Sequence, residues 1–506
     1  MNTGPIDSAV NRAGFPQNLF MGWCCLAAIF LVVAAIAGCG GGSAASPESA
    51  VTRTPPPPPA PPPPPPPSIT SVNVTQHNNF GFDLITFTIT GSNFLPGVKA
   101  IIHPQGPGIL CCADIVGGTL TEPGVIAFTP GQGTQTASST VIVSVRNPDK
   151  SESQAVSTTI PFPPPPNLPS VMFDYVAYAV TNLPPHYKDP NSPGGNLAGT
   201  DNTPATNPIT NAGATLGRVL FYDKFLSANN TISCGSCHQQ AVGFTDANQL
   251  SGGFQGGVTK RRAMSLSNAK FYQRGRFFSD ERAATLEDTV LQPIQDSIEM
   301  GNNLSRLIPK MAQTTYYPGL FQAAFGTPDI TPDRMSSALA QFVRSMVSYQ
   351  SKFDQAFAAG TNGNPNFAAV FNASELHGQA LFTSLGCAKC HTTAGQVSDT
   401  VHNIGLEAVT TDPGAGAGKF KTPSLRNVGA RIWFMHDTHF VGLKSVIEFY
   451  NNRVQDNPDL DPLLRNPDGT VRRLNLSAQD ENDLVNFLNT LTDNVFLKDP
   501  KFADPF

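Results

Sequence analysis

Residues 234–238 read CGSCH, and residues 387–391 repeat the same five-residue pattern as CAKCH. In each pattern two thiols can form thioethers with the vinyl groups of a haem, while the adjacent imidazole binds the iron. A disulfide or a zinc site is the alternative use of these residues, but no further cysteine pair or histidine cluster lies nearby in the sequence to complete a zinc site. The patterns therefore predict two covalently bound c-type haems. The predicted attachment residues are Cys234, Cys237, Cys387 and Cys390, and the predicted iron ligands are His238 and His391.

Residues 1–39 have the features of an export signal, which fits a protein that attaches haem covalently. An apolar run at residues 26–36, too short to span a bilayer comfortably, leads into Cys39 and a stretch of glycine and serine. This arrangement resembles a bacterial lipobox, in which Cys39 becomes the lipidated first residue of the mature protein. Ordinary signal-peptide cleavage after Ala37 is the alternative. We expect a lipid-anchored protein that faces the periplasm or the cell surface, with the outer membrane as its destination.

The composition is that of a multidomain globular protein. With 506 residues, 40% of them hydrophobic, the chain can bury large cores, and its net charge of -5 comes with no basic patch suited to nucleic acid. Once the haem-binding, lipid-anchor and signal-peptide cysteines are assigned, only the adjacent pair Cys111 and Cys112 is left. This pair can form a strained vicinal disulfide or can simply be buried, and the sequence leaves both alternatives open.

The region before the first haem pattern contains a spacer and a β-rich segment. Residues 40–67 are small and polar and then almost entirely proline, which favours an extended, semi-rigid chain. Between residues 68 and 162, short β-branched runs alternate with turn residues, a pattern typical of a β-sandwich. The expected strands lie at residues 69–74, 84–90, 98–102, 140–146 and 155–160. The stretches at residues 85–94 and 143–149 also resemble immunoglobulin-like IPT/TIG domains, so we predict such a sandwich at residues 68–162.

The remainder of the chain has helical periodicity. Thr331 is followed by a proline and an acidic residue, as at a helix start, and apolar residues then recur on one helical face. Ser477 and Asp480 have the spacing of a capping box and precede a similar apolar stripe. We therefore predict two mainly α, cytochrome c-like haem domains, at residues 163–355 and 356–506, with one haem pattern in each.

Short motifs in a characteristic order surround both haem patterns. They read LGRVLFYD at residues 216–223, GFTD at 243–246, EMG at 299–301, NIGL at 403–406 and FKTPSLRN at 420–427. In this order they resemble the bacterial di-haem cytochrome c peroxidase and MauG family, and the resemblance covers residues 200–495. It implies an oxidoreductase of the cytochrome c peroxidase type, with the peroxidatic haem in the first haem domain and the electron-transfer haem in the second.

The resemblance assigns a catalytic role to Glu299. In the family, a carboxylate at this position lies beside the peroxidatic haem, where it can move a proton between the two oxygens of hydrogen peroxide. A surface acid near a helix start is the alternative interpretation. Many family members close the peroxidatic iron with a loop histidine, but no histidine occurs between His238 and His377. We therefore expect an open first haem that reacts with peroxide without prior reduction.

The second ligand of the C-terminal haem iron is predicted to be Tyr450. The motif alignment places Tyr450 where peroxidases of the family usually carry methionine and MauG-type proteins carry tyrosine. A thioether raises the reduction potential of haem iron, whereas a phenolate stabilises oxidised iron and lowers it. Met435 is the rival ligand, and an aromatic packed on the haem without ligation is a further alternative for Tyr450.

The chain departs from the family pattern between the two haems. Ser279 occupies the position of a tryptophan that lies between the haems in the family, and Thr289 occupies that of a glutamine in the distal pocket. The positions of the family's interdomain calcium ligands align with Arg262, Arg431 and Trp433. Because arginines place positive charge where the cation belongs, we expect the calcium to be absent and contacts from the arginines to carboxylates or haem propionates to substitute.

These interpretations predict an enzyme that reduces hydrogen peroxide to water with electrons that enter at the C-terminal haem. The donor is expected to be a small redox protein or an oxidisable protein, and the resemblance also implies a homodimer as one form of the protein. One alternative function is MauG-like oxidation of tyrosine or tryptophan residues in a partner protein. The other is a non-catalytic, surface-located di-haem electron carrier. Tyr450 favours the MauG-like alternative, Glu299 favours an enzyme, and the departures at Ser279 and Thr289 keep the carrier alternative open.

Overall fold

The computed structural model describes residues 62–79, 82–104, 115–129, 139–160, 165–193 and 196–506. The predicted signal peptide with Cys39, the spacer up to residue 61 and the pair Cys111 and Cys112 lie outside these residues. Within the described part of the chain, no helix has the length and the apolar character needed to cross a membrane.

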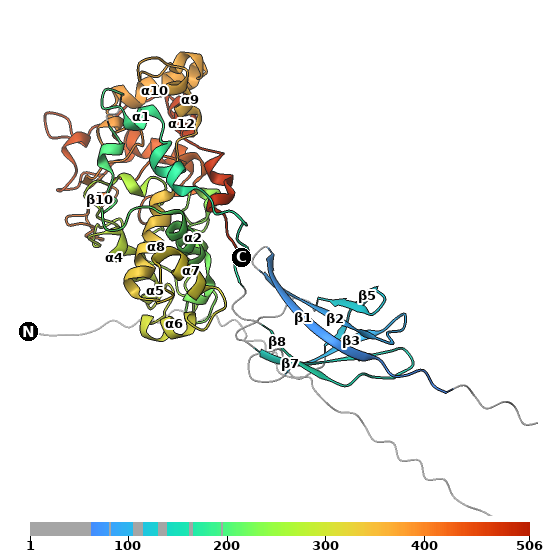
Figure 1. Ribbon diagram of the computed structural model, residues 1–506. Coiled ribbons are helices and arrows are strands. Elements are labelled where there is room, and N and C mark those ends of the chain that lie inside the picture. The colour runs from blue at the N-terminus through green and yellow to red at the C-terminus, as the bar shows by residue number, and fades with distance from the viewer. Residues whose placement is uncertain (1–61, 80–81, 105–114, 130–138, 161–164, 194–195) are drawn as a thin grey trace, which may run out of the picture. The chain divides into compact units, whose positions relative to one another are not determined.

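The strands of residues 68–160 form two antiparallel four-stranded sheets (Figure 1). The first sheet has the order β1-β2-β6-β5 and the second has the order β4-β3-β7-β8. The first sheet consists of β1 (Ser68–Asn79), β2 (Phe82–Ser92), β6 (Val125–Phe128) and β5 (Thr119–Glu122). The second consists of β4 (Ile115–Gly117), β3 (Lys99–Pro104), β7 (Ser139–Arg146) and β8 (Val156–Ile160).

The two sheets share one apolar core. Phe87 and Ile89 of β2 and Ile126 of β6 are buried together with Val143 and Val145 of β7. Alternate residues of β2 and β7 therefore face inward, because successive side chains of a strand point to opposite faces of its sheet. This N-terminal region is thus rich in sheet, as predicted. Its assignment as an immunoglobulin-like IPT/TIG domain stays a prediction.

A first helical unit, which we define as residues 165–347, surrounds the first haem pattern (Figure 1). Its longest helices are α2 (Asn211–Tyr222) and α8 (Pro332–Ser345), which pack side by side. A Cβ atom at Gly217 of α2 would lie 2.0 Å from the carbonyl oxygen of Ala338 in α8, so the close approach of the helices requires glycine there. The other helices of this unit are α1 (Pro185–Lys188), α3 (Cys234–Cys237), α4 (Leu286–Val290), α5 (Gln292–Gln295), α6 (Leu304–Met311) and α7 (Tyr317–Phe325).

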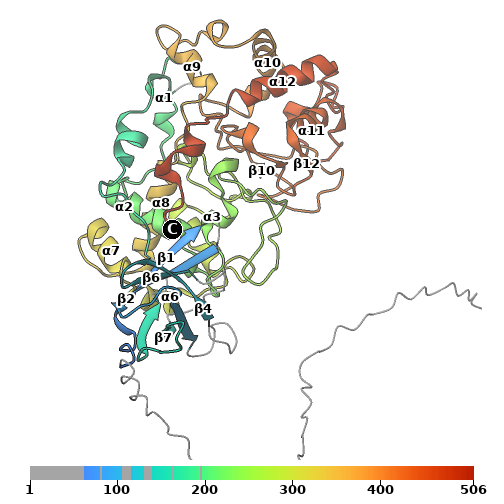
Figure 2. The same cartoon turned by 90° about the vertical axis from the view of Figure 1, so that its right-hand side faces the viewer.

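A second helical unit, residues 351–491, surrounds the second haem pattern (Figure 2). Its helices are α9 (Lys352–Ala358), α10 (Ala373–Ser384), α11 (Gly442–Glu448) and α12 (Ala478–Asn489). Phe382 of α10 packs with Leu484 and Phe487 of α12 in a separate apolar core. Two short hairpins lie between the helices, β9 (Val401–His402) with β10 (Phe420–Lys421) and β11 (Trp433–Phe434) with β12 (Phe440–Val441).

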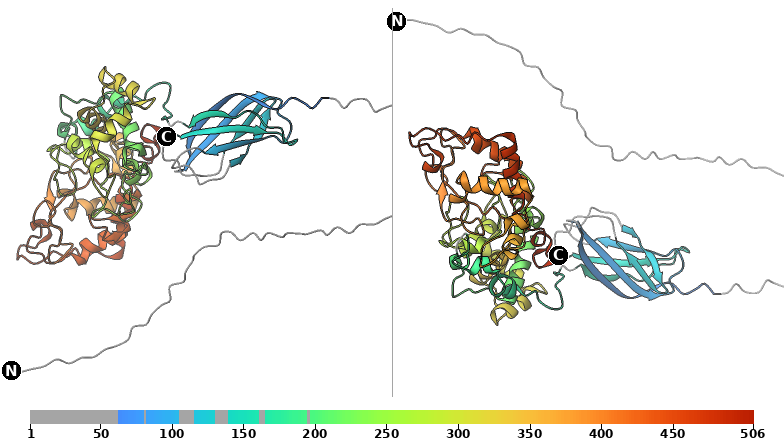
Figure 3. Two further views of the ribbon diagram at one scale, coloured as in Figure 1. Left: turned by 90° about the horizontal axis from the view of Figure 1, so that it is seen from below. Right: turned by 90° about the horizontal axis from the view of Figure 1, so that it is seen from above.

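The C-terminal segment returns from the second helical unit to the first. Figure 3 shows the C-terminus away from the other orange-to-red residues, beside the green ones. The hydroxyls of Tyr175 and Tyr222 donate hydrogen bonds to the carbonyl oxygens of Lys501 and Phe502, at 2.9 and 2.6 Å. The Phe502 side chain is buried in the core of the first unit. The C-terminal segment therefore connects the two units through these hydrogen bonds and through the packing of Phe502.

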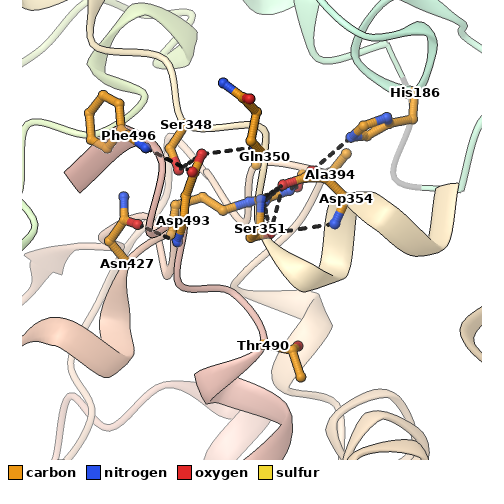
Figure 4. A network of polar contacts seen from close by, with 12 residues as sticks. His186, Ser348, Gln350, Ser351, Asp354, Ala394, Asn427, Thr490, Asp493 and Phe496 are labelled. Carbon is orange, nitrogen blue, oxygen red and sulfur yellow. Dashed lines mark hydrogen bonds and ion pairs between the residues drawn. The ribbon is translucent and has the colours of Figure 1, made fainter. Parts of the chain in front are cut away.

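A buried polar network also joins the helical units (Figure 4). Asp354 accepts hydrogen bonds from both terminal nitrogens of Arg426, at 2.5 and 2.8 Å, and its Oδ1 lies 2.8 Å from Nε2 of His186. Nearby, Asp493 accepts from the backbone N–H of Gln350, and its own backbone N–H donates to Asn427. These partners come from distant parts of the sequence, so the network fixes the boundary between the two helical units.

Candidate active site

The first haem pattern begins on α3, a single helical turn capped by Ser233 and Ser236. A Cβ atom at Gly235 would lie 2.4 Å from the Tyr222 ring, so the second position of the pattern has to be glycine for α2 to pack on this turn. Cys234 and Cys237 are both free thiols. Burial raises the pKa of Cys234 to about 12 and that of Cys237 to about 11, so both thiols are protonated at neutral pH and remain available for thioether formation.

The hydrogen bonding of His238 suits a residue that would hold a haem iron. Its Nδ1 lies 2.9 Å from the carbonyl oxygen of Phe244, in a turn where Gly243 and Phe244 both have positive φ. Burial lowers the pKa of His238, and the hydrogen bond to Phe244 offsets part of that shift, so the ring is neutral near pH 7. A neutral imidazole that donates through Nδ1 leaves the lone pair of Nε2 for a metal.

Glu299 lies close to the first haem pattern. Asp296 accepts hydrogen bonds from the backbone N–H groups of Ile298 and Glu299, which fixes the turn after α5. Burial, followed by the charge of Asp296, raises the pKa of Glu299, and the Glu299 charge in turn raises the pKa of both Cys234 and Cys237. Among the described residues, no side chain forms a hydrogen bond or an ion pair with the Glu299 carboxylate. The structure therefore brings Glu299 beside the predicted first haem site as a half-buried acid.

The second haem pattern opens into a cavity of about 340 Å³. Its attachment residues, Cys387 and Cys390, are free thiols that line this cavity together with His391. Nδ1 of His391 is buried without a hydrogen-bond partner, although the backbone of Pro423 lies close enough to raise the pKa of the ring. Burial lowers the pKa of His391 to about 4, so this imidazole is also neutral.

Tyr450 and Met435 line the same cavity as His391. Helix α11 widens into a π-helical turn at Phe449–Arg453, and this turn presents the Tyr450 side chain. Burial raises the pKa of the Tyr450 hydroxyl, and the sulfur atoms of Cys390 and Cys387 add to the shift, so the phenol lies near the attachment residues. The hydroxyl forms no hydrogen bond with any described residue. The geometry brings both candidate ligands to the cavity, and π-helical turns often occur at functional sites.

The residues that depart from the family pattern also lie near this cavity. Ser279 and Trp433 both line it, and Nε1 of Trp433 donates to the carbonyl oxygen of Ala247 in the first unit, at 3.2 Å. The Thr289 hydroxyl instead donates to the Thr285 carbonyl of its own helix, so this side chain is engaged locally. Lys421, to which sequence reasoning assigned no role, lines the cavity and lies within ion-pair distance of Glu281 and Asp399. Its place in the FKTPSLRN motif at residues 420–427 was the signal that could have identified it.

The residues present fit two haems. Each pattern combines two free thiols with a neutral imidazole, and the cavity at the second pattern is mainly apolar, as a porphyrin requires. The zinc alternative has no support, because the described residues contain no group of three or more histidine, cysteine, aspartate and glutamate side chains that could hold a metal ion.

Comparison with known proteins agrees with this geometry. Residues 211–362 match the family described as di-haem cytochrome c peroxidase. The methylamine utilization protein MauG of Methylophilus methylotrophus is 30% identical over 299 residues, which cover 57% of this chain and 84% of that protein. The cytochrome c551 peroxidase of Nitrosomonas europaea is 30% identical over 249 residues, or 46% of this chain and 71% of that protein.

A solved structure supports the fold of the helical units. It belongs to a MauG-like protein associated with microbial copper homeostasis, is 27% identical and superimposes with a TM-score of 0.54. The alignment covers 60% of this chain and 96% of that protein. From its paired haem patterns, its helical units and these relatives, the chain belongs to the di-haem cytochrome c peroxidase and MauG family, and it is an oxidoreductase.

Proposed function

We propose that this protein reduces hydrogen peroxide to water at the haem of residues 234–238, with electrons that pass through the haem of residues 387–391. Two electrons and two protons convert one peroxide into two water molecules. The observation that carries the proposal is the position of Glu299, a half-buried carboxylate whose charge acts on both Cys234 and Cys237. A covalently attached haem would supply the redox chemistry there, with His238 as its protein ligand.

Glu299 is the proposed proton carrier. As a carboxylate it accepts a proton from one oxygen of hydrogen peroxide, and as a carboxylic acid it donates that proton to the other oxygen, which leaves as water. Its raised pKa makes the group a better proton acceptor than an ordinary glutamate. The lack of a hydrogen-bond partner among the described residues leaves both carboxylate oxygens free for this transfer.

Tyr450 is the proposed second residue, besides His391, that would hold the iron of the C-terminal haem. Both side chains line one cavity, and the Tyr450 hydroxyl has no hydrogen-bond partner among the described residues. A phenolate from Tyr450 would favour the oxidised state of an iron held here. This observation favours, as the second candidate function, MauG-like oxidation of tyrosine or tryptophan residues in a partner protein.

The location and the electron donor are further parts of the proposal. We infer export and a lipid anchor at Cys39, so that the enzyme faces the periplasm or the cell surface. A small redox protein would then deliver electrons to the C-terminal haem in the peroxidase reaction. In the MauG-like reaction, the oxidised partner protein is itself the donor.

A steady-state assay tests the role of Glu299. Purified holoprotein is supplied with hydrogen peroxide and a reduced cytochrome c, and oxidation of the cytochrome is followed by absorbance. We expect Glu299→Gln to lower kcat by about 10²–10⁴-fold. The matched control, Glu122→Gln on the exposed surface of β5, should retain the wild-type rate. Equal rates for wild type and Glu299→Gln would exclude the proposed proton transfer.

A further inference from the structure

Arg262, which is buried, and Arg431, which is half-buried, come from opposite helical units and line the same cavity. Arg262 donates hydrogen bonds to the Thr245 hydroxyl and to the Asp246 carbonyl oxygen, both at 3.1 Å. Only 9% of the surface of Arg262 is exposed. Arg431 donates to the carbonyl oxygens of Ser424 and Arg426, at 2.9 and 2.5 Å. Neither arginine forms an ion pair with a carboxylate among the described residues, so their hydrogen bonds all go to neutral oxygens.

The hydrogen bonding of this arginine pair is incomplete. The Nε atoms of Arg262 and Arg431 are both buried and have no hydrogen-bond partner. Burial lowers the pKa of Arg262 to about 10, and the charge of Asp246, which lies beyond ion-pair distance, opposes the shift. Burial also lowers the pKa of Arg431 to about 9, and Arg262 contributes to that shift. No carboxylate of the described residues lies within ion-pair distance of either guanidinium group, so the pair can accept a further anion.

The pair lies between the two haem patterns. Arg262 binds Thr245, the residue after Phe244, whose carbonyl oxygen lies 2.9 Å from Nδ1 of His238. A Cβ atom on Gly243 in the same turn would lie 3.8 Å from Nε of Arg431, which brings the two arginines to one turn.

The same pair reaches the second pattern through Arg431. This arginine binds the carbonyl oxygen of Ser424, the residue after Pro423, whose carbonyl faces His391. The charge of Arg262 acts on His238 and the charge of Arg431 acts on His391, and in both cases it lowers the pKa of the imidazole. Each predicted iron ligand therefore has a buried positive charge beside it.

We propose that Arg262 and Arg431 bind the carboxylate of a haem propionate and hold a fixed positive charge between His238 and His391, which raises the reduction potentials of both haems. This inference rests on the proposed binding of two haems. A haem carries two propionate carboxylates, and a bidentate guanidinium is well suited to bind one. A nearby positive charge favours the reduced iron because that state has one positive charge less, and burial limits screening by salt.

Potentiometric titration of the full-length holoprotein tests the proposal without the use of peroxide. Arg262→Met and Arg431→Met should each shift the potentials of both haems downward. Arg262→Lys and Arg431→Lys, which keep the charge, should stay closer to wild type, and these variants also serve if a methionine variant fails to retain haem. The matched control is Arg472→Met, because Arg472 lines the cavity beside Cys387 and hydrogen-bonds Leu385 within the second unit. The Arg472→Met substitution should lower only the reduction potential of the C-terminal haem.

Three results would overturn the proposal. The first is an unchanged N-terminal potential in both methionine variants. The second is a shift of the wild-type potentials by added acetate, which would mean that the pair takes a free carboxylate and not a propionate. The third is a tightly bound metal ion that disappears when either arginine is replaced. Peroxide turnover is measured separately from the reduction potentials. A protein that fails to reduce peroxide would contradict the proposed function, but its reduction potentials would still test the role of the arginine pair.

Discussion

At the scale of single residues, the environment of each ionisable group decides its role. Glu299 is half-buried and Asp354 is buried, yet burial and the charge of Asp296 raise the pKa of Glu299, whereas Arg426 and His186 outweigh burial and lower the pKa of Asp354. The first arrangement suits a proton carrier and the second suits a permanent ion pair.

The raised pKa of Glu299 predicts the pH dependence of the reaction with peroxide. Proton acceptance requires the carboxylate form, so the rate should fall as the pH decreases through the pKa of this group. Because the pKa is raised, the decline should begin at a higher pH than for an ordinary glutamate, whose pKa is about 4.3. Stopped-flow rates from pH 4 to 8 would show this, and Glu299→Gln should remove the decline. A pH-independent wild-type rate over this range would contradict the prediction.

Replacement of Tyr450 should change the C-terminal haem selectively. In Tyr450→Met a thioether takes the place of the phenol, which stabilises the ferrous state, so the potential of this haem should rise while that of the first haem stays the same. Spectroelectrochemistry of wild type and variant makes the comparison. Met435→Leu is the matched control, because it removes the rival ligand from the same cavity and should leave the potential unchanged if Tyr450 binds the iron. A drop in potential in Met435→Leu would assign the ligand to Met435 instead.

At the scale of secondary-structure elements, the sequence predicted the helix caps and the longer strands, because short contiguous patterns encode them. Thr331 caps α8 and Ser477 forms a capping box with Asp480 on α12, as their spacing indicated. Each of the five predicted runs overlaps a strand, β1, β2, β3, β7 or β8. Strands β4, β5 and β6 were not predicted, because each has only three or four residues, too few for a clear alternating pattern.

The sequence could not predict the contacts between elements. Asp354 and Arg426 are 72 positions apart, and Arg262 meets Arg431 only because the two helical units are joined. Pattern reasoning identified the haem-binding residues because CGSCH and CAKCH are contiguous, and Glu299 and Tyr450 came from the family resemblance. Other features depend on tertiary packing and have no signature in the local sequence. They are the burial of the side chains, the incomplete hydrogen bonding of the arginines and the π-helical turn at Tyr450.

The Asp354 network should dominate the stability of the boundary between the helical units. Asp354→Ala leaves the buried Arg426 charge without a partner, which should lower the free energy of unfolding by about 3–5 kcal/mol. Thermal denaturation followed by circular dichroism measures the loss. Asp480→Ala, which removes the capping-box carboxylate from α12, is the control and should cost much less. An equal loss in both variants would contradict a special role for the buried pair.

The same network sets how stability responds to acid. Burial opposes ionisation of Asp354, but Arg426 and His186 lower its pKa below the ordinary value of about 3.9. A depressed pKa contributes stability that is fully present above the unfolded-state pKa and is lost as the pH falls through the folded-state pKa. Wild type should therefore lose stability below about pH 4, and the difference between wild type and Asp354→Ala should shrink over the same interval. A constant difference down to pH 2 would refute this linkage.

At the scale of the whole molecule, the two helical units act as one structural body. The C-terminal segment and the Asp354 and Asp493 networks join them. The sheet-rich region of residues 68–160 has its own core and contributes no residue to either haem pattern.

Covalent attachment predicts that both haems stay with the denatured chain. Intact-mass spectrometry of the unfolded protein should show the mass of two haems added to the mature polypeptide. The double variant Cys387→Ala and Cys390→Ala should lose one haem and keep the other, because the first pattern lies in a separate helical unit. A polypeptide mass without haem would exclude thioether attachment.

The most direct test of the account is the reaction of the ferric holoprotein with one equivalent of hydrogen peroxide, followed by electron paramagnetic resonance. The account predicts a high-spin signal from the open first haem, which is lost rapidly on addition of peroxide in wild type but persists in Glu299→Gln. A Tyr450-dependent change at the second haem would favour the MauG-like reaction. If both haems are low-spin and peroxide changes neither signal, the protein does not activate peroxide at the first haem, and the proposed function is wrong.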